Sequence, residues 1–541
     1  MRSANQISFI TPIRQWFCAC AVLLMMLCLP GCARSEGSVK DAGHVRAPEL
    51  QPNLGWLNTD KPLRLGQELK GHVVLLDFWT YCCINCMHIL PDLDYLEKKY
   101  ADQPFMVVGV HSAKFENEEG RETIAAAVKR YKIHHPVVID DNMAIWQRYA
   151  VQAWPTFILI DSKGYIVGFA SGEGNREVLD KAIALTLEKG RENGSLASAP
   201  LKIENSATTT SGHALAFPGK VLADAARGRL FIADSNHNRI VVATLPGEDG
   251  KARLLGVIGD GGQGRRDGSF EQAQFHNPQG LALRENVLYI ADTDNHLVRA
   301  ADFATSRVTT IAGTGEQGFD RRGGKRGTSQ AIASPWALEP GPDGQQLFIA
   351  MAGLHQIWSL DLKTSTVQVF SGSGRENIVD GAAGEACFAQ PSGLARIGGK
   401  LYVADSEVSG VREVDIASGA VQTIVGRGLF IFGDVDGTGD SVRLQHPLGL
   451  AAHGRDLILA DTYNHKIKEV QPASRKVTTL AGTGKPGREA ADGKPAFFEP
   501  GGVDVAGDVI YVADTNNHRV VRLDSKTGKW GEVVVEGLDA K

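Results

Sequence analysis

The spacing of apolar positions near residue 80 changes from that of a buried strand to that of a helix. Residues 71–79 (GHVVLLDFW) are continuously apolar and rich in β-branched side chains, which is typical of a strand covered on both faces. Residues 87–100 (MHILPDLDYLEKKY) then place apolar side chains at helical spacing. The pattern therefore predicts a buried strand that passes directly into a helix.

The second half of the chain repeats one pattern of short strands. Copies such as LYIADTDNHLVR start 53 to 59 residues apart, at Leu230, Leu288, Leu347, Leu401, Leu457 and Ile510. Each unit holds four short strands separated by Gly, Asn and Asp turns, which is typical of a propeller blade. Because a blade cannot bury its own faces, the copies predict one closed six-bladed β-propeller over residues 213–541. Residues 191–212, rich in Ser, Thr, Ala and Gly, are expected to form a linker.

One face of this propeller is expected to carry its function. Strands alternate in direction within a blade, so the Asp-Thr-x-Asn-His turns lie on the same face as the long connections between blades. Repetition favours structural roles for the recurring residues, namely turn bracing by His296, His465 and His518 and tight turns at the Asp-Gly pairs 267–268, 380–381, 436–437 and 492–493. Blades three and four break the pattern at Met351 and Val408.

The first residues predict export. Arg2 and Arg14 give a cationic start, and the apolar core 17–29 is too short to span a bilayer, so residues 1–31 are expected to be a signal peptide. Leu-Pro-Gly-Cys at residues 29–32 resembles the bacterial lipobox, which implies lipidation of Cys32 and an anchor linker over residues 32–46. Because Ala33 follows, the expected location is the bacterial cell envelope, anchored in the outer membrane and facing the periplasm.

Charge and cysteine content narrow the picture further. The net charge is −5, and removal of Arg2 and Arg14 with the leader makes it −7, so nucleic acid is not an expected partner. Eight cysteines are present. Three leave with the leader and Cys32 is lipidated, which leaves Cys82, Cys83, Cys86 and Cys387. This small set indicates that the exported chain is not a disulfide-stapled scaffold.

Cys83 and Cys86 stand two residues apart where the strand gives way to the helix. Unpaired N–H groups and the helix dipole stabilise a thiolate at such a place, so the pair is predicted to exchange disulfides. A Cys-x-x-Cys pair is also half of a zinc site, and His88 and His111 lie nearby. Neither histidine belongs to a His-x₃₋₅-His pair and no second Cys-x-x-Cys exists, so we expect no metal and no cofactor.

Residues 47–190 resemble the thioredoxin superfamily, particularly its membrane-anchored TlpA-like branch. The resemblance implies that Asp77 is a buried carboxyl that takes a proton from the resolving thiol. An ordinary hydrogen-bonded strand residue is the alternative for Asp77. Pro91 matches the proline that kinks the active-site helix, and residues 151–156 (VQAWPT) match the loop with a cis-proline. Pro155 is thus implied to shape a substrate groove beside Trp154 and Thr156.

Two positions depart from that superfamily. Cys82 stands where a tryptophan is usual; it is either a small side chain filling a smaller pocket, which we favour, or a third redox residue. Ile84 and Asn85 lie between the cysteines, where the familiar proline is missing. Reduction potentials in this fold vary over about 150 mV, so the direction of electron flow stays open.

The order of the two folds and the string CCINC resemble one family, NHL repeat-containing protein 2 and its bacterial relatives. Animal members carry a further β domain after the propeller. The resemblance implies a multidomain chain, an α/β thioredoxin-like domain followed by an all-β six-bladed NHL-type propeller. The lipobox-like string at residues 29–32 adds the expectation that lipid alone attaches this chain to a membrane. Cys83 would be the exposed nucleophile and Cys86 the resolving thiol for protein thiol or disulfide substrates, and the propeller would dock an unidentified protein partner.

Three other functions remain open. A binding scaffold with a vestigial thioredoxin-like domain is the first, although the intact Cys83 and Cys86 argue against it. A thiol peroxidase is the second, because Thr80-x-x-Cys83 matches part of the peroxiredoxin motif, whereas Leu76 occupies its proline position. A propeller lyase with metal-bound histidines is the weakest.

Overall fold

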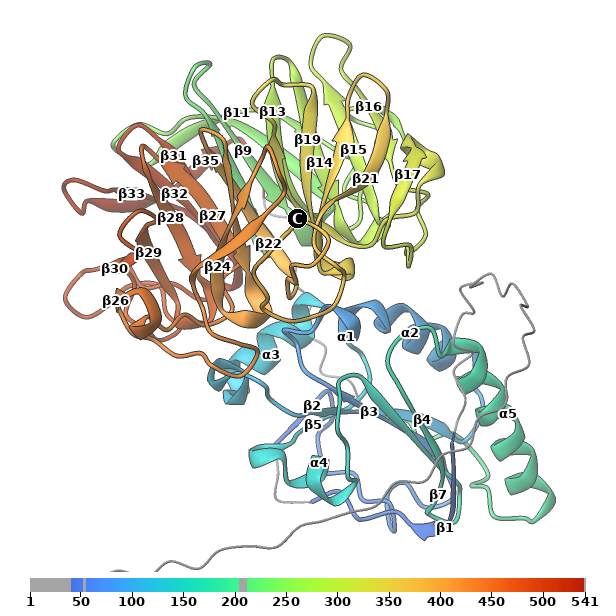
Figure 1. Cartoon of the computed structure of the whole chain (residues 1–541). Helices are drawn as coiled ribbons and strands as arrows, with labels where there is room; N and C mark the ends of the chain where they lie inside the picture. Colours follow the sequence, from blue (N-terminus) through green and yellow to red (C-terminus); the bar gives the residue numbers. More distant parts are fainter. Residues whose placement is uncertain (1–39, 52–54, 204–211, 540–541) are drawn as a thin grey trace, which may run out of the picture. The chain divides into compact units, whose positions relative to one another are not determined.

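The computed structural model describes residues 40–51, 55–203 and 212–539. The expected signal peptide and the lipidation site Cys32 lie outside these residues. Figure 1 shows an α/β domain in blue to teal and a β-propeller in green to red. Among the described residues, none of the helices combines the length and the apolar character needed to cross a bilayer.

The α/β domain is built on a seven-stranded mixed sheet. Its strands lie in the order β1 (Lys40–Arg46), β7 (Tyr165–Ser171), β6 (Thr156–Ile160), β3 (Val73–Trp79), β4 (Phe105–His111), β5 (Val137–Ile139) and β2 (Trp56–Leu57). The central strand β3 is parallel to β4 and antiparallel to β6, and every residue of it is buried. The continuous apolar run of the sequence is therefore the central strand, as predicted.

Helices cover both faces of this sheet. They are α1 (Ile84–His88), α2 (Leu90–Lys99), α3 (Arg121–Arg130), α4 (Ala144–Arg148) and α5 (Arg176–Glu192), with short 3-10 turns η1 (Glu116–Glu119) and η2 (Asp141–Met143). Leu93 and Ile183, from α2 and α5, pack on Val73 and Leu75 of β3. Ile145 of α4 packs on the opposite face. Alternation along β3 places Asp77 on the face that α2 and α5 cover.

The propeller consists of six sheets arranged around one axis (Figure 1). From the outermost to the innermost strand, the first blade is β35 (Val534–Glu536), β11 (Lys251–Ile258), β10 (Arg239–Thr244), β9 (Arg229–Asp234) and β8 (Val221–Asp224), and the second is β12 (Gly268–Ser269), β16 (Arg307–Ala312), β15 (Leu297–Asp302), β14 (Val287–Asp292) and β13 (Pro278–Arg284). The third is β17 (Gly323–Arg326), β21 (Thr366–Ser371), β20 (Gln356–Asp361), β19 (Gln346–Met351) and β18 (Pro335–Pro340), and the fourth is β25 (Val421–Val425), β24 (Gly410–Asp415), β23 (Lys400–Asp405) and β22 (Pro391–Ile397). The fifth is β26 (Gly437–Thr438), β30 (Lys476–Ala481), β29 (Lys466–Gln471), β28 (Asp456–Asp461) and β27 (Gly449–His453), and the sixth is β34 (Trp530–Glu532), β33 (Arg519–Asp524), β32 (Val509–Asp514) and β31 (Pro500–Ala506).

The last strand closes the ring. After completing the sixth blade, the chain runs on into β35, which pairs in parallel with β11 of the first blade. This pairing joins the two ends of the propeller and covers the outer edge of β11, which would otherwise expose unpaired backbone groups.

Buried carboxylates hold five of the six blades to the long connection that precedes them. In five blades an aspartate at the end of the second strand accepts a hydrogen bond from a backbone N–H of that connection: Asp234 from Ala216, Asp292 from His276, Asp405 from Ala389, Asp461 from Gln445 and Asp514 from Phe498. Met351 replaces the aspartate in the third blade, where Trp358 donates to Gln356 instead. In the other five blades the aspartate also pairs with an arginine or lysine of the third strand, so blade three has an aromatic residue where the others have an ion pair.

All four Asp-Gly pairs are structural, as expected, and in the fourth the Gly493 N–H donates to the Ala490 carbonyl across a tight turn (3.0 Å). Asp267, Asp380 and Asp436 each accept from the backbone N–H and the hydroxyl of a threonine on the outer strand of their blade, at 2.7–3.1 Å. Asp492 has no such threonine partner among the described residues and pairs with Lys494.

Candidate functional site

The two cysteines lie where the central strand ends. Cys83 is the last residue before α1, and its carbonyl accepts from the N–H groups of Cys86 (3.0 Å) and Met87 (3.2 Å). Both thiols are free, Cys83 is half-buried, and Cys86 is buried. Burial raises the pKa of the Cys86 thiol well above its usual range, and the neighbouring Cys83 and Asp77 act in the same direction. Cys83 is therefore the accessible sulfur and Cys86 the sheltered one.

Asp77 lies on β3 with both carboxyl oxygens buried and without a hydrogen-bond partner among the described residues. Burial raises its pKa to about 7; the positive potential of nearby His135 opposes this, and Glu97 adds to it. On the neighbouring strand Gly109 stands opposite Asp77. A Cβ at Gly109 would lie 3.0 Å from Trp79 Nε1 and 3.3 Å from His135 Nε2, so the missing side chain makes room for these two rings. The alternative of an ordinary hydrogen-bonded strand residue does not fit this carboxyl.

The loop before β6 completes the expected constellation. The Trp154–Pro155 bond is cis, as the resemblance implied. The Trp154 indole donates to the Ser112 carbonyl (3.0 Å) and packs in the cluster that holds the cysteines. Thr156 is buried, and its hydroxyl donates to the Ala153 carbonyl (2.8 Å) of the same loop. Thr156 thus braces the loop, whereas Trp154 lies against the redox pair.

Cys82 fills a closed position. Its side chain is fully buried, 3.9 Å from the Thr80 hydroxyl, and burial raises its thiol pKa well above the usual range. Its backbone N–H donates to Glu118 (2.8 Å). These contacts match the interpretation of Cys82 as a small packing residue.

The propeller face that carries the turns packs against this site through two sets of residues. The first, the pre-proline ring, is the residue before the proline that opens each innermost strand: Phe217, Asn277, Ser334, Gln390, His446 and Glu499. The second set, the turn ring, is the middle residue of the three-residue 3-10 turn that follows the second strand of each blade: Asn236, Asp294, Gly353, Glu407, Tyr463 and Asn516. Both sets differ in residue type from blade to blade, while their neighbours repeat.

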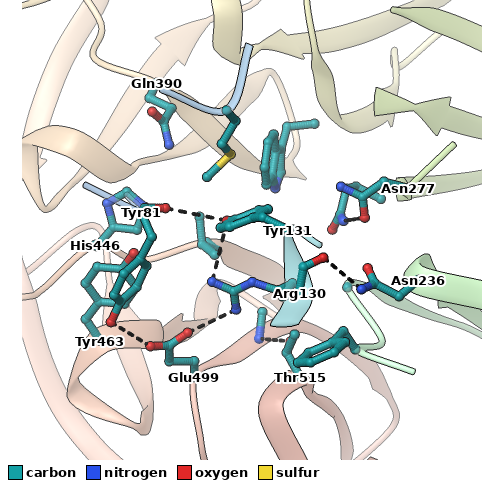
Figure 2. Close-up of a pocket in the computed structure, with 17 residues that line it drawn as sticks. Tyr81, Arg130, Tyr131, Asn236, Asn277, Gln390, His446, Tyr463, Glu499 and Thr515 are labelled. Atoms are coloured by element: carbon teal, nitrogen blue, oxygen red, sulfur yellow. Dashed lines mark hydrogen bonds and ion pairs between the residues drawn. The ribbon is translucent and has the colours of Figure 1, made fainter. Parts of the chain in front are cut away.

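Hydrogen bonds from both rings reach the α/β domain (Figure 2). Glu499 accepts from the Tyr81 hydroxyl (3.0 Å) and from Arg130 (3.0 Å) at the end of α3. Asn516 accepts from Arg130 (3.0 Å), and Asn236 donates to its carbonyl (2.8 Å). Arg130 is therefore held by three different blade segments near the propeller axis.

Apolar and charged contacts extend this interface on one side. Phe115 packs between Phe432 and Tyr463, at ring-centroid distances of 4.7 and 5.6 Å. Lys114 forms a buried ion pair with Glu407, which belongs to the turn ring. A buried ion pair is costly unless its geometry is good, so it fixes the mutual position of the surfaces that carry it.

A cavity of about 50 Å³ remains at the centre of this interface (Figure 2). Its polar lining includes Arg130, Tyr131, Asn277 and Glu499. It has room for a few water molecules, at roughly 10–15 Å³ each. A larger groove of about 370 Å³ begins beside Met87 and His88 and runs along α2, bordered by Asp294 and His296 of the propeller.

The turn histidines His296, His465 and His518 have the bracing role predicted for them, and His355 has the same role although the sequence did not single it out. Nδ1 of each accepts a hydrogen bond from the backbone N–H of a pre-proline ring residue in the next blade, at 3.0–3.1 Å. Asn238 and Ser409 accept the same bond in the remaining two blades, at 3.0 and 3.2 Å. The described residues contain no group of three or more His, Cys, Asp or Glu side chains placed to bind a metal ion.

The sequence did not reveal the two rings as part of the site. A signal was nevertheless present, because each ring position varies in residue type between repeats whose flanking residues recur. A repeat position released from the structural pattern is free to make contacts outside the propeller.

Comparisons with known proteins cover nearly the whole chain. A thioredoxin-like family model matches residues 71–166, and an NHL repeat model matches residues 497–523. The chain is 45% identical to Arabidopsis thaliana protein SUPPRESSOR OF QUENCHING 1, chloroplastic, over 90% of this chain and 47% of that protein, so it spans about half the length of that relative. It is 43% identical to Gallus gallus NHL repeat-containing protein 2, over 89% of this chain and 70% of that protein. Over 29% of its length, it is 29% identical to 90% of the Bacillus cereus thiol-disulfide oxidoreductase ResA.

Proposed function

The chain belongs to the NHL repeat-containing protein 2 family, and we propose that it is a thiol–disulfide oxidoreductase whose redox pair is Cys83 and Cys86. One observation carries this proposal: an accessible Cys83 stands beside a sheltered Cys86, above a buried carboxyl that has no partner among the described residues. The likeness of the first domain to ResA, named as a thiol-disulfide oxidoreductase, supports the same chemistry.

The reaction follows from these positions. The Cys83 thiolate attacks one sulfur of a substrate disulfide, the Cys83–sulfur bond forms, and the second substrate sulfur leaves as a thiolate with the electron pair. Cys86 then gives its proton to the Asp77 carboxylate and attacks the Cys83 sulfur. The Cys83–Cys86 disulfide forms and the first substrate sulfur leaves as a thiolate, so the substrate is reduced and the pair oxidised. Run backwards, the same steps oxidise a dithiol substrate.

The proton step needs a group whose pKa lies near the working pH. Asp77, with a pKa raised to about 7 by burial, is protonated in about half of the molecules at neutral pH and can both take and return a proton. The pKa of Cys86 lies well above that, because burial disfavours its thiolate. A base beside the Cys86 thiol therefore increases the rate of the resolving step most, because that step uses the Cys86 thiolate.

The test is a trapping experiment. In Cys86→Ser, the mixed disulfide between Cys83 and its substrate should persist, because a hydroxyl does not displace sulfur, and non-reducing electrophoresis should show adducts that thiols remove. Cys83→Ser should form none, and Cys82→Ser should behave like the wild type. Equal adduct yields in Cys86→Ser and Cys83→Ser would refute the assigned roles.

Partner selection belongs to the same proposal. The groove along α2 begins beside α1, and residues of both domains line it. It is the proposed binding site for a polypeptide segment of a protein substrate. Binding there would keep a weakly held partner near Cys83, by raising its local concentration to about the millimolar range.

Membrane attachment through Cys32 is proposed from the leader and the Leu-Pro-Gly-Cys string, with the protein in the bacterial envelope, anchored in the outer membrane and facing the periplasm. If Cys32→Ser leaves processing and membrane fractionation unchanged, the anchor is not a lipid at this residue.

A binding scaffold is the second candidate function. It is favoured by the extent to which the propeller covers the residues around the cysteines. A scaffold needs no reversible Cys83–Cys86 disulfide, so titration of that disulfide against glutathione separates the two functions.

A further inference from the structure

Gln390, a residue of the pre-proline ring, bonds the backbone of the redox loop, residues 80–84. Gln390 precedes Pro391 at the start of β22, and its side chain is 1% exposed. Its own N–H donates to Nδ1 of His355 (3.1 Å), so the third blade fixes the backbone from which the side chain projects. Gln390 is thus a rigid part of the propeller that reaches into the other domain.

The side-chain amide of Gln390 binds the backbone on both sides of Cys83. Its Nε2 donates to the Cys82 carbonyl (2.9 Å), and its Oε1 accepts from the Ile84 N–H (2.8 Å). An amide side chain supplies one donor and one acceptor together, as a neighbouring strand does. The nucleophile is therefore held between two hydrogen bonds that come from the propeller.

Both of these backbone groups are buried, because Cys82 is 0% and Ile84 2% exposed. A buried carbonyl and N–H left without partners would turn toward any water or side chain within reach, and the loop would move with them. Within the described part of the chain, Gln390 is the pre-proline ring residue that bonds the backbone of the redox loop. Glu499 bonds a side chain of that loop, the Tyr81 hydroxyl.

We propose that Gln390 is a positioning residue for the redox pair: it holds the backbone around Cys83 so that the Cys83 sulfur stays accessible and within reach of Cys86. This inference rests on the proposed oxidoreductase function. It gives the propeller a role in the chemistry besides binding partners, because any motion that separates the domains releases the redox loop. Reactivity at Cys83 is thereby coupled to the docked state.

The experiment compares Gln390→Ala and Gln390→Glu with the wild type in the full chain. The control is Gln330→Ala, which removes an equally buried propeller amide that bonds backbone groups outside both rings and both cavities. The measured quantities are the rate constant of the reduced pair with a small aromatic disulfide from pH 5 to 9 and its equilibrium with glutathione. Thermal melting checks that each variant is folded.

Gln390→Ala should react about tenfold more slowly than the wild type and shift the glutathione equilibrium at least threefold, whereas Gln330→Ala should stay within twofold in both. A protonated glutamate offers a donor and an acceptor, and a carboxylate offers acceptors only. The rate of Gln390→Glu relative to the wild type should therefore recover as the pH is lowered from 8 to 5, while that of Gln390→Ala stays flat.

The glutathione measurement on the wild-type protein tests the proposed function separately from the positioning role of Gln390. If the wild-type pair forms no reversible disulfide with glutathione, the oxidoreductase function fails and the inference with it. If the wild type is active and folded Gln390→Ala matches it in rate and equilibrium, only the positioning role is overturned. A Gln390→Glu profile parallel to that of Gln390→Ala at every pH would also overturn it.

Discussion

At the scale of single residues, the proposed chemistry is assigned to three side chains, one on the strand β3 and two at the start of the helix that follows. Cys83 has access to solvent, and burial holds Cys86 as a thiol. The Asp77 carboxyl on β3 is buried, and neither of its oxygens has a hydrogen-bond partner among the described residues. A buried carboxyl without a hydrogen-bond partner lowers the stability of the folded protein. Such groups occur at functional sites where a proton is exchanged away from water.

Asp77→Asn should stabilise the protein above neutral pH and slow the resolving step. The folded state keeps the Asp77 proton up to about pH 7, whereas the unfolded chain releases it near 3.8. Between these values the unfolded state binds fewer protons, so the free energy of unfolding falls as pH rises. Removing the carboxyl should raise that free energy by up to about 4 kcal/mol at pH 8, at about 1.4 kcal/mol per pKa unit, and by nothing near pH 3.

Denaturant unfolding at pH 3, 6 and 8 measures this difference, and the lifetime of the mixed disulfide should lengthen at least about tenfold. Asp60→Asn, at an exposed position, serves as the control. A stability difference independent of pH would contradict the assignment of a raised pKa to Asp77.

At the scale of elements, the repeated turn serves the blade and the interface at once. Each turn ends with a residue in the left-handed region, such as His465 with φ +52°, whose side chain accepts a hydrogen bond from the next blade. In four blades the residue that donates this bond contacts the α/β domain with its own side chain, namely Ser334, Gln390, His446 and Glu499. The structural repeat thus sets the place of each variable contact residue, and the residue type sets what it binds.

Replacing His465 tests the turn with a substitution taken from the protein itself. His465→Asn copies the first blade, where Asn238 accepts the equivalent bond and tolerates positive φ. His465→Ala loses the acceptor and strains the backbone, so it should lower the free energy of unfolding by about 1–3 kcal/mol, and His465→Asn by less than half of that. Equal losses in urea unfolding would show that the inter-blade bond is not what the histidine supplies.

The histidines of these turns should make the stability of the folded protein sensitive to acid. Burial lowers the pKa of His355, His465 and His518 to about 4, and that of His296 to about 3. In the unfolded chain these histidines bind protons near pH 6.5, whereas in the folded propeller they do not. Their contribution to the free energy of unfolding is therefore lost as the pH falls from about 6.5 to 4. His465→Asn should reduce the slope of unfolding free energy against pH in this window, and an unchanged slope would contradict the prediction.

At the scale of the whole molecule, the propeller covers the redox domain through polar, aromatic and ionic contacts. Tyr81 and Phe115 are buried partly against Tyr463. Deleting the propeller would expose these rings, so a truncated chain is a poor probe of what the propeller does. Substitutions at the interface are the sharper tool.

The buried pair of Lys114 and Glu407 provides such a probe. Lys114→Ala and Glu407→Ala each leave one charge buried without its partner, which typically costs 3–5 kcal/mol. The double variant removes both charges, so its loss of stability should be smaller than the sum of the two single losses by at least about 1 kcal/mol. Each single variant should also slow alkylation of Cys83, because weakening the docked state releases the redox loop from Gln390.

Denaturant unfolding and timed alkylation followed by mass spectrometry measure both effects. The exposed pair Lys526 and Asp508 is the control, since surface pairs contribute about 0–1 kcal/mol. Losses at Lys114 and Glu407 that add within about 0.5 kcal/mol would show that the pair does not act as a unit.

Much of this molecule is determined by local features of the sequence. The apolar run at residues 73–79 predicts the central strand, the spacing of Cys83 and Cys86 predicts their place at a helix start, and the resemblance identifies the cis bond before Pro155. The six repeats predict the propeller and the bracing role of its turn histidines. Each of these depends on neighbours in the chain or on a period, which a sequence carries directly.

Only the tertiary structure decided which residues complete the site. Gln390 lies more than 300 positions from Cys82 in the chain, yet its amide bonds the backbone beside the nucleophile. Closing the ring brings the variable residue of every blade to one face, and docking places that face on the redox loop. The sequence determined the fold and the reactive pair because both follow from local pattern; the tertiary structure decided the partners of that pair, because they meet only when six distant turns are brought together around one axis.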